Sequence, residues 1–278
     1  MTQATRIIGV MNQKGGCGKT TTAVNLAAAL HLKGHRVLVV DMDPQAHATL
    51  GLNGRLQKPI ERTIHDPLLR RHGLDSILVS PMPGLRLAPS GDDMLFAERD
   101  MGSGEQGEDR LRECLQLTAE PHDFVLIDCP PSLGPLTFNA LRACGEILVP
   151  VEIGFYSLNG VSGFLRALRR YRRAWLAQKR IRALATLFDQ RTSFAREVIL
   201  EMRRFFGVAL YDTVIHHNVR LKEAASHGLP ITEYDRRSRG CADHLALADE
   251  VLADGVPRSA VGRASHERPA AAAEPASR

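Results

Sequence analysis

The sequence predicts an α/β fold in which a mostly parallel, twisted β-sheet is covered by helices on both faces. Short apolar runs alternate with helical stretches along most of the 278 residues, which is the order produced when helices join parallel strands. A glycine-rich loop joins the first apolar run to the first helical stretch, and acidic residues end two of the runs. We assign residues 1–256 to one large domain and residues 257–278, rich in Ala, Pro, Arg and Glu, to a disordered tail.

The elements of this fold can be placed in chain order from the apolar patterns. The glycine-rich loop is followed by a helix over 22–34 that stops at Gly34, and a second helix is expected over 110–119. Residues 53–84 are mixed and punctuated by Pro and Gly, and the MGSGEQGED stretch that begins at Met101 reads as a loop. The expected strands are 6–11, 36–43, 85–90, 123–130, 146–152, 183–189 and 210–215.

Composition and charge exclude several classes of protein. The 44% apolar and 24% charged content is typical of a soluble domain, and no apolar run approaches the roughly 20 residues that cross a bilayer. The first residues, MTQATR, lack the apolar stretch of a signal peptide, so we expect a cytoplasmic protein. A net charge of +5 is compatible with nucleic-acid binding. The cysteines have no CxxC spacing, which favours free thiols in a reducing compartment over disulfides or zinc: Cys17, Cys114, Cys129, Cys144 and Cys241.

The loop NQKGGCGKTTT (12–22) has the composition of a phosphate-binding loop. Its glycines let backbone amides approach phosphate oxygens, and the amino end of the following helix adds positive potential. The closing Lys19 is suited to the β- and γ-phosphates and the Thr20 hydroxyl to Mg²⁺. A simple glycine turn is the alternative. The predicted ATP-binding residues of this loop are Lys14, Gly15, Gly16, Cys17, Gly18, Lys19, Thr20 and Thr21.

Acidic residues at two strand ends support the nucleotide interpretation. Asp128 closes FVLIDCPPS, where a Walker B aspartate would hold Mg²⁺. Asp41 and Asp43 close VLVVDMDPQ, on a strand expected beside that of the phosphate loop, and a carboxylate there is suited to orienting the attacking water. Solvated acids are the alternative for either place taken alone.

Five segments in order give the sequence a specific resemblance: NQKGGCGKTTTAVNLAAAL, VLVVDMDPQAHATLGL, DFVLIDCPPSLGPLTFNAL, VPVEIGFYSLNGVSGF and NVRLKEAASHGLPITEYDRRSRG. Together they resemble the ParA/Soj partition ATPases, within the deviant-Walker group of P-loop NTPases that includes MinD. The resemblance spans about 5–255 and is weakest over 53–110. It implies that Lys14 reaches the partner's phosphates across an ATP-sandwich homodimer, that Asp43 orients the attacking water, and that Asn218 contacts adenine.

The sequence also departs from that family at three places. The family commonly has Pro-Arg where this chain has His216-His217, valine at Cys17 and proline at Ala225. The histidine pair bears on the base contact and on any DNA contact by the replaced arginine. Adjacent histidines on a strand or loop diverge, and no third ligand accompanies them, which is unfavourable for a metal site.

Basic residues suggest two surfaces for DNA. The resemblance implies non-specific, salt-sensitive phosphate contacts through Arg203, Arg204, Arg220 and Lys222. A second candidate is the stretch 166–182, whose cations are Arg166, Arg169, Arg170, Arg172, Arg173, Lys179, Arg180 and Arg182. Four of them recur at helical spacing and should form one basic face: Arg166, Arg169, Arg170 and Arg173. An ordinary solvated helix face is the alternative. Only five residues precede the first strand, so no helix-turn-helix is expected there.

These observations predict an ATP- and Mg²⁺-dependent ATPase that dimerises with ATP, coats DNA and partitions a chromosome or plasmid when a ParB-like partner stimulates hydrolysis. The expected location is cytoplasmic and nucleoid-associated. Alternatives are a related machine that positions a protein cargo, such as a chemoreceptor array or carboxysome, through an adaptor, and a MinD-like regulator. The tail has no Phe, Leu, Ile or Trp, so no membrane binding is expected through it. A reductase like the nitrogenase iron protein would need cluster cysteines, and the spacing of Cys129 and Cys144 is unfavourable.

Overall fold

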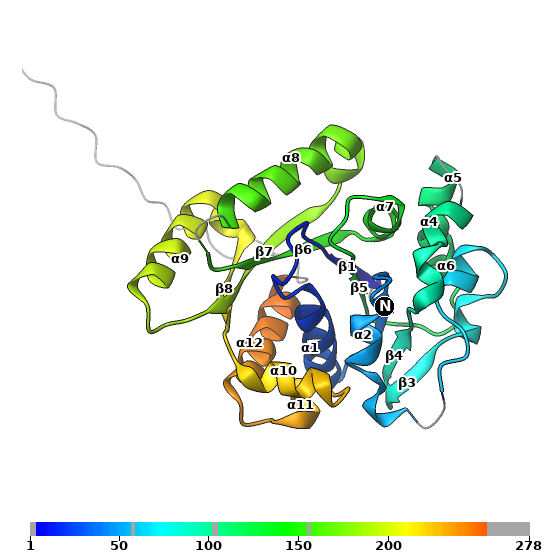
Figure 1. Cartoon of the computed structure of the whole chain (residues 1–278), viewed down its shortest axis with the longest axis horizontal. Coiled ribbons are helices and arrows are strands. Elements are labelled where there is room, and N and C mark those ends of the chain that lie inside the picture. Colours follow the sequence, from blue (N-terminus) through cyan, green and yellow to red (C-terminus); the bar gives the residue numbers. More distant parts are fainter. Residues whose placement is uncertain (1–3, 57–58, 102–104, 155–156, 255–278) are drawn as a thin grey trace, which may run out of the picture.

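A computed structural model describes residues 4–56, 59–101, 105–154 and 157–254. The described residues form one eight-stranded sheet in the order β3-β4-β2-β5-β1-β6-β7-β8 (Figure 1). The strands are β1 (Arg6–Val10), β2 (Val37–Asp41), β3 (Val79–Met82), β4 (Leu85–Ala88), β5 (Phe124–Asp128), β6 (Glu146–Glu152), β7 (Arg180–Phe188) and β8 (Leu210–His216). The predicted fold class, a mostly parallel sheet flanked by helices, is confirmed.

The central strands are parallel and almost wholly buried. β1 pairs with β5 and β6, and β2 pairs with β4 and β5, all in parallel. Every residue of β2 and of β5 is buried, as expected of continuous apolar runs covered on both faces. The carboxyl ends of these strands therefore meet at one edge of the sheet, and the register places Asp41 beside Asp128.

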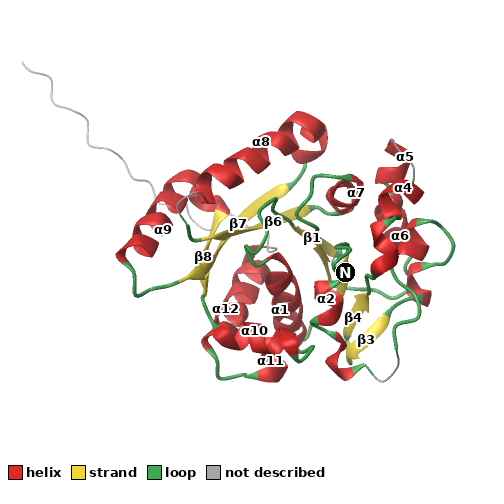
Figure 2. Cartoon of the chain, viewed as in Figure 1, coloured by secondary structure: helices red, strands yellow, loops and turns green. Residues whose placement is uncertain are grey.

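Helices cover both faces of the sheet (Figures 1 and 2). On one face lie α1 (Lys19–Leu32), α10 (Val219–Ser226), α11 (Ile231–Tyr234) and α12 (Arg239–Asp254). On the other lie α7 (Pro135–Ala143), α8 (Ser157–Leu176) and α9 (Ser193–Phe206). Alternate residues of a strand enter the two cores: Leu38 and Val40 pack with the α7–α8 side, whereas Val37 and Val39 pack with α1 and α12.

The strand β3 and its hairpin were not predicted. Among the described strands β3 alone runs antiparallel to its neighbour, and it lies at the edge of the sheet, where Pro81 leaves no ladder hydrogen bond unmade. Pro83 and Gly84 form the turn to β4, and Gly84 has φ +87°, which a glycine adopts without strain. A four-residue strand containing proline gives too weak a pattern to be recognised.

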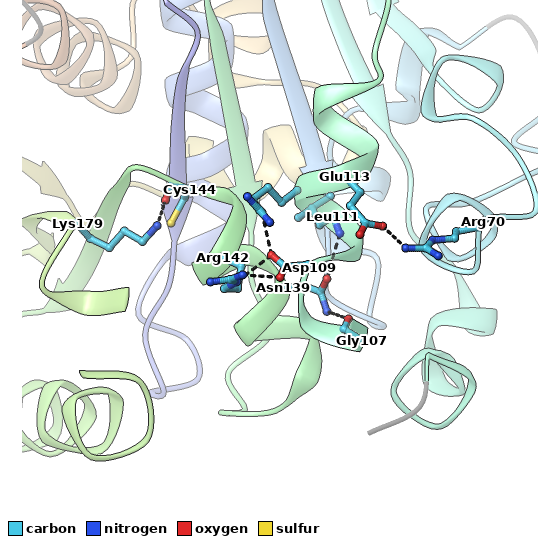
Figure 3. A network of polar contacts seen from close by, with 10 residues as sticks. Arg70, Gly107, Asp109, Leu111, Glu113, Asn139, Arg142, Cys144 and Lys179 are labelled. Carbon is cyan, nitrogen blue, oxygen red and sulfur yellow. Dashed lines mark hydrogen bonds and ion pairs between the residues drawn. The ribbon is translucent and has the colours of Figure 1, made fainter. Parts of the chain in front are cut away.

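The expected loop from Met101 is partly helical, which corrects that prediction. Within and beside it lie α4 (Ala97–Asp100), α5 (Glu105–Glu108) and α6 (Arg110–Gln116). Tertiary contacts stabilise this segment: the buried amide of Asn139 on α7 donates to the Gly107 carbonyl (2.8 Å) and accepts from the Leu111 amide (3.0 Å) (Figure 3). Arg142 and Asp109 form an ion pair beside it. These partners are distant in sequence, so local composition did not reveal them.

Short elements complete the fold. Between β2 and β3 lie α2 (His47–Leu50), α3 (His65–Leu68) and the 3₁₀ turns Asn53–Arg55 and Leu74–Ser76. Further 3₁₀ turns are Asp92–Leu95 and Gly207–Ala209. Helix α1 begins three residues earlier than expected, at Lys19, and its carboxyl end is followed by Gly34 with φ +91°, the left-handed residue that commonly follows a helix. The proposed tail, 257–278, lies outside the described residues.

Candidate nucleotide site

One cavity of about 960 Å³ lies at the carboxyl edge of the sheet. Its size suits a nucleotide-sized ligand, and its place follows the rule that open α/β sheets bind ligands beyond the carboxyl ends of their strands. Its wall is formed by residues from both the amino-terminal and the carboxyl-terminal parts of the chain. The lining residues include Gly15, Gly16, Gly18, Lys19, Thr20, Thr21, Asp43, Glu152, Thr186, Leu187, His216, His217, Asn218 and Lys222.

The glycine loop forms the phosphate end of this cavity. Gly16 and Gly18 have φ of +74° and +90°, which turns the loop back on itself before α1. A Cβ on Gly15 or Gly16 would meet no protein atom within 4 Å, so the backbone there faces open space that a ligand can approach. Lys19 is buried, and its Nζ donates to the Lys14 carbonyl at 3.1 Å. The loop is thus a preformed anion cradle at the amino end of a 14-residue helix.

Two contacts hold the loop in this shape. The Thr186 hydroxyl on β7 donates to the Cys17 carbonyl at 2.8 Å, which ties the loop to the far half of the sheet. The Cys17 thiol donates to the Lys14 carbonyl at 3.2 Å and is fully buried. Burial raises the pKa of this thiol, with the Lys19 charge acting in the opposite direction. Cys17 is therefore a neutral packing group here.

Asp128 and Thr20 meet beside the cradle. The Thr20 hydroxyl donates to Asp128 Oδ2 at 2.7 Å, while the buried Asp128 Oδ1 has no protein partner. Burial and then the charge of Asp41 raise the pKa of Asp128 well above its usual range. The donor set fits Mg²⁺, which takes one or two protein oxygens and completes its shell with water and phosphate. Among the described residues, no group of three or more His, Cys, Asp or Glu is arranged so that it could hold a metal ion by protein ligands alone.

Asp41 and Asp43 differ in surroundings. Asp41 is fully buried, and burial raises the pKa of its carboxyl to about 6 against the hydrogen bonds that it accepts from Thr49. Asp43 is 8% exposed and lines the cavity; its Oδ1 accepts from the Gln45 amide at 2.9 Å. Of the two, Asp43 is thus the one that lines the cavity, and its role toward the attacking water stays a prediction.

Lys14 forms an ion pair within its own chain. Its Nζ lies 2.6 Å from Glu152 Oε2, and the two side chains are 43% and 31% exposed. Glu152 ends β6 and lines the cavity. Sequence reasoning did not single it out, although an acid at a strand end was the signal used for Asp128.

The other end of the cavity is built by residues after β7 and β8. Asn218 caps α10, since its Oδ1 accepts from the Arg220 amide at 2.8 Å, which leaves its Nδ2 available to a ligand. Leu187 has φ +55°, a strained conformation for a leucine, at a register shift between β7 and β8. Backbone strain of this kind is common where a ligand must be approached closely.

The histidine pair has one structural and one exposed member. His216 Nδ1 lies 3.0 Å from Asp243 Oδ2, and its Nε2 lies 3.2 Å from Arg239 Nη2. Because arginine can only donate, Nε2 is the acceptor for Arg239, and Nδ1 is the ring nitrogen that donates toward Asp243. His217 is exposed and lines the cavity.

The predicted DNA-contacting residues lie in two places. Lys222 lines the nucleotide cavity one turn after Asn218, an environment that the sequence did not predict. Arg203, Arg204 and Arg220 are exposed and lie outside it. Each pairs with a nearby acid: Arg203 with Asp212 (3.5 Å), Arg204 with Glu201, and Arg220 with Glu223 (2.7 Å). Their contact with DNA stays a prediction.

The basic stretch 166–182 is only partly helical. Arg166, Arg169 and Arg170 are exposed on α8, but the helix ends at Leu176. The last three cations bind other parts of the fold. Lys179 donates to the Cys144 carbonyl (Figure 3), Arg180 donates to the Asp254 carbonyl, and Arg182 pairs with Asp254 at 2.9 Å. The side chains of Arg172 and Arg173 lie outside the described part of the structure.

Comparison with known proteins gives a consistent family. The AAA domain family matches residues 5–182. The sporulation initiation inhibitor protein Soj of Bacillus subtilis is 42% identical over 90% of this chain and 99% of its own. The chromosome partitioning protein ParA of Myxococcus xanthus is 39% identical over 91% of this chain and 90% of its own.

Solved structures agree on the fold. A cobyrinic acid a,c-diamide synthase of Mycobacterium smegmatis, with ATP analogue and magnesium, matches with a TM-score of 0.76 and 32% identity over 90% of this chain and 95% of its own. A putative plasmid partition protein of Borrelia burgdorferi bound to AMPPNP has a TM-score of 0.77 at 21% identity, over 90% of this chain and 100% of its own, a likeness of fold alone. No helix in the described part of the chain has the length and apolar character to span a membrane. The chain has a phosphate loop and aspartates at the ends of two neighbouring strands, and it is 42% and 39% identical to Soj and ParA over about nine tenths of its length. It therefore belongs to the ParA/Soj family of P-loop ATPases.

Proposed function

We propose that the protein is a Mg²⁺-dependent ATPase that forms an ATP-sandwich homodimer, binds double-stranded DNA non-specifically and partitions a chromosome or plasmid when a ParB-like partner stimulates hydrolysis. The observation that carries the proposal is the single cavity that joins the phosphate loop, Asp43 and the base-side wall around Asn218. The identity to Soj and ParA over about nine tenths of the chain supports the biological role.

In this proposal the chain's own residues divide the work. The backbone of 15–21 and Lys19 hold the phosphates, and Asn218 offers its free amide to adenine. Thr20 and Asp128 would hold Mg²⁺, which supplies charge neutralisation on the phosphates. Asp43, the carboxylate that faces the cavity, orients the attacking water.

Dimerisation and DNA binding follow from charge. Lys14 lies on the exposed rim of the loop, where its ammonium can meet the phosphates of a second protomer. One protomer offers few phosphate contacts to DNA, and two linked protomers bind much more tightly than one. Arg203, Arg204 and Arg220 are the proposed DNA contacts. Lys222 lines the nucleotide cavity, so its proposed DNA contact would lie beside the bound nucleotide. We propose a nucleoid-associated location on the same grounds.

The first test is nucleotide binding and DNA co-sedimentation with and without ATP. Lys19→Ala is expected to lose ATP, and the parent is expected to sediment with random-sequence duplex DNA only when ATP is present. Asp43→Ala is expected to bind ATP and accumulate as dimer on DNA without hydrolysis. Unchanged ATP affinity in Lys19→Ala would contradict the site. A parent that dimerises with ATP but ignores DNA would remove the partition role and leave a cargo-positioning or MinD-like ATPase.

A further inference from the structure

A buried chain of hydrogen bonds connects the two aspartates of the DMDPQ segment to β4. The Thr49 hydroxyl donates to Asp41 Oδ2 at 2.7 Å, and the Thr49 amide donates to the same oxygen at 2.8 Å. The Ser90 amide donates to the Thr49 hydroxyl at 2.9 Å, and the Ser90 hydroxyl donates to the Asp43 carbonyl at 2.7 Å. Thr49 and Ser90 are both buried, and neither was singled out from the sequence.

This series of hydrogen bonds has a defined donor-to-acceptor direction and forms a closed ring. The Thr49 hydroxyl has one proton, which goes to the carboxylate of Asp41, so its lone pair is what receives the Ser90 amide. The Asp41 Oδ1 atom in turn accepts from the Asp43 amide at 3.1 Å. The backbone of Asp43 is therefore held at its N–H by Asp41 and at its C=O by the Ser90 hydroxyl and by the Ala46 amide (2.9 Å). Thr49 bonds both Asp41 and Ser90.

Among the bonds to Asp43, the one from Ser90 comes from a distant part of the sequence, whereas those with Asp41, Gln45 and Ala46 are local. The Asp43 side chain is oriented locally by the Gln45 amide, but the position of its backbone depends on β2 and β4, which are neighbours in the sheet and about fifty residues apart in sequence. Catalytic geometry is sensitive to this position, since a displacement of about 1 Å can cost on the order of 100-fold in rate. The phosphate loop lies between β1 and α1. Among the described residues, the bonds of the Thr49 and Ser90 hydroxyls go to Asp41 and Asp43 and not to this loop.

We propose that Thr49 and Ser90 are positioning residues for ATP hydrolysis, which hold the backbone of Asp43 so that its carboxylate faces the attacking water. The proposal rests on the proposed function, which assigns that water to Asp43. The proposal predicts different effects on catalysis and on ATP binding. Loss of the Thr49 hydroxyl should leave the phosphate loop intact and allow residues 43–49 to move.

The experiment compares Thr49→Val, which keeps shape and removes the hydroxyl, with Thr49→Ser, which restores it. For Thr49→Val we expect kcat for ATP to fall by about 10-fold or more, a smaller displacement than the 100-fold case, with KM and ATP affinity within about twofold of the parent. Thr49→Ser is expected to recover most of the rate. Without nucleotide, amide hydrogen exchange of 43–49 is expected to speed up in Thr49→Val and not in Thr49→Ser.

Two further variants keep the result interpretable. Thr118→Val removes a hydroxyl bonded to the Cys114 carbonyl, distant from the cavity lining, and is expected to hydrolyse ATP like the parent. Ser90→Ala removes only the bond to the Asp43 carbonyl and serves if Thr49→Val does not fold; we expect lower kcat with unchanged ATP affinity.

Asp43→Ala, measured in parallel, separates the two levels of the proposal. If Asp43→Ala hydrolyses ATP normally, the assignment of the water to Asp43 is wrong and the positioning role falls with it. If Asp43→Ala is inactive while Thr49→Val and Ser90→Ala keep the parent's kcat, the positioning role alone is refuted. A Thr49→Val defect that Thr49→Ser does not repair, or one that lowers ATP affinity as much as kcat, also refutes it.

Discussion

The ion pair between Lys14 and Glu152 makes a quantitative prediction about dimerisation. Lys14 Nζ lies 2.6 Å from Glu152 Oε2 in its own chain, so under the proposed function the lysine must leave this carboxylate before it reaches a partner's phosphates. The perturbation is Glu152→Gln, which keeps the size of the side chain and removes its charge. We expect the variant to dimerise more tightly with ATP than the parent.

The magnitude follows from exposure and symmetry. Both side chains are partly exposed, so each pair is worth about 0.2–1 kcal/mol. A symmetric dimer breaks two pairs, so the dimer dissociation constant should fall by about 2–30-fold. The difference between the variant and the parent should shrink at high salt, because salt screens the Lys14–Glu152 ion pair of the parent.

Sedimentation velocity at saturating ATP measures this constant, with Asp43→Ala as the common background to prevent hydrolysis. Asp249→Asn is the matched control: it removes the carboxylate from Lys33, a pair of the same 2.6 Å length that lies outside the cavity. ATP affinity is measured separately, since Glu152 lines the cavity. Equal or weaker dimerisation of Glu152→Gln relative to Asp249→Asn at saturating ATP would refute the restraint on Lys14.

Three further predictions follow from the same geometry. Lys14→Ala is expected to bind ATP and stay monomeric in size-exclusion chromatography, and a stable, active dimer would contradict the role in trans. Arg220→Glu and the Arg203/Arg204→Glu pair are expected to lose DNA while keeping ATP-driven dimerisation, and single Ala variants should reduce the slope of log K against log salt by about one per lost contact; parental DNA binding by both charge-reversal variants would move the site to α8. Burial raises the pKa of Asp41 from its usual value near 3.8 to about 6, so the folded state binds this proton more strongly than the unfolded state does, and its contribution to the free energy of unfolding should rise as pH falls from 7 toward 4. Urea unfolding without nucleotide checks this, and Asp41→Asn should lose that slope; an identical slope in both proteins would contradict it.

The sequence predicted the central sheet well because parallel strands buried on both faces are continuous apolar runs. Lys19, Thr20 and Asp128 lie at one edge of this sheet because loop, strand and acid have a fixed spatial relation in this topology, and their roles stay predictions. The sequence missed β3 and α5 because a proline-containing edge strand and a glycine-rich helical turn form through contacts with distant residues such as Asn139.

Basic residues show the limit of pattern reading most clearly. Eight cations over 166–182 suggested one surface, yet Arg180 and Arg182 begin a strand and bond Asp254, more than seventy residues away. Lys222 matched a DNA-contact position and lies at the nucleotide cavity. A count of charges does not reveal which of them the fold itself uses, because that depends on tertiary partners.

The cavity's two walls have a consequence for how the protein is made. The phosphate loop leaves the ribosome first, but the wall that carries Thr186, Asn218 and Lys222 is synthesised about two hundred residues later, and the Asn25 side chain of α1 accepts from the Ile231 amide later still. A nascent chain therefore displays a phosphate loop without a place for the base. Once the second wall is complete, ATP at 100 times its dissociation constant adds about 2.7 kcal/mol to the stability of the whole fold.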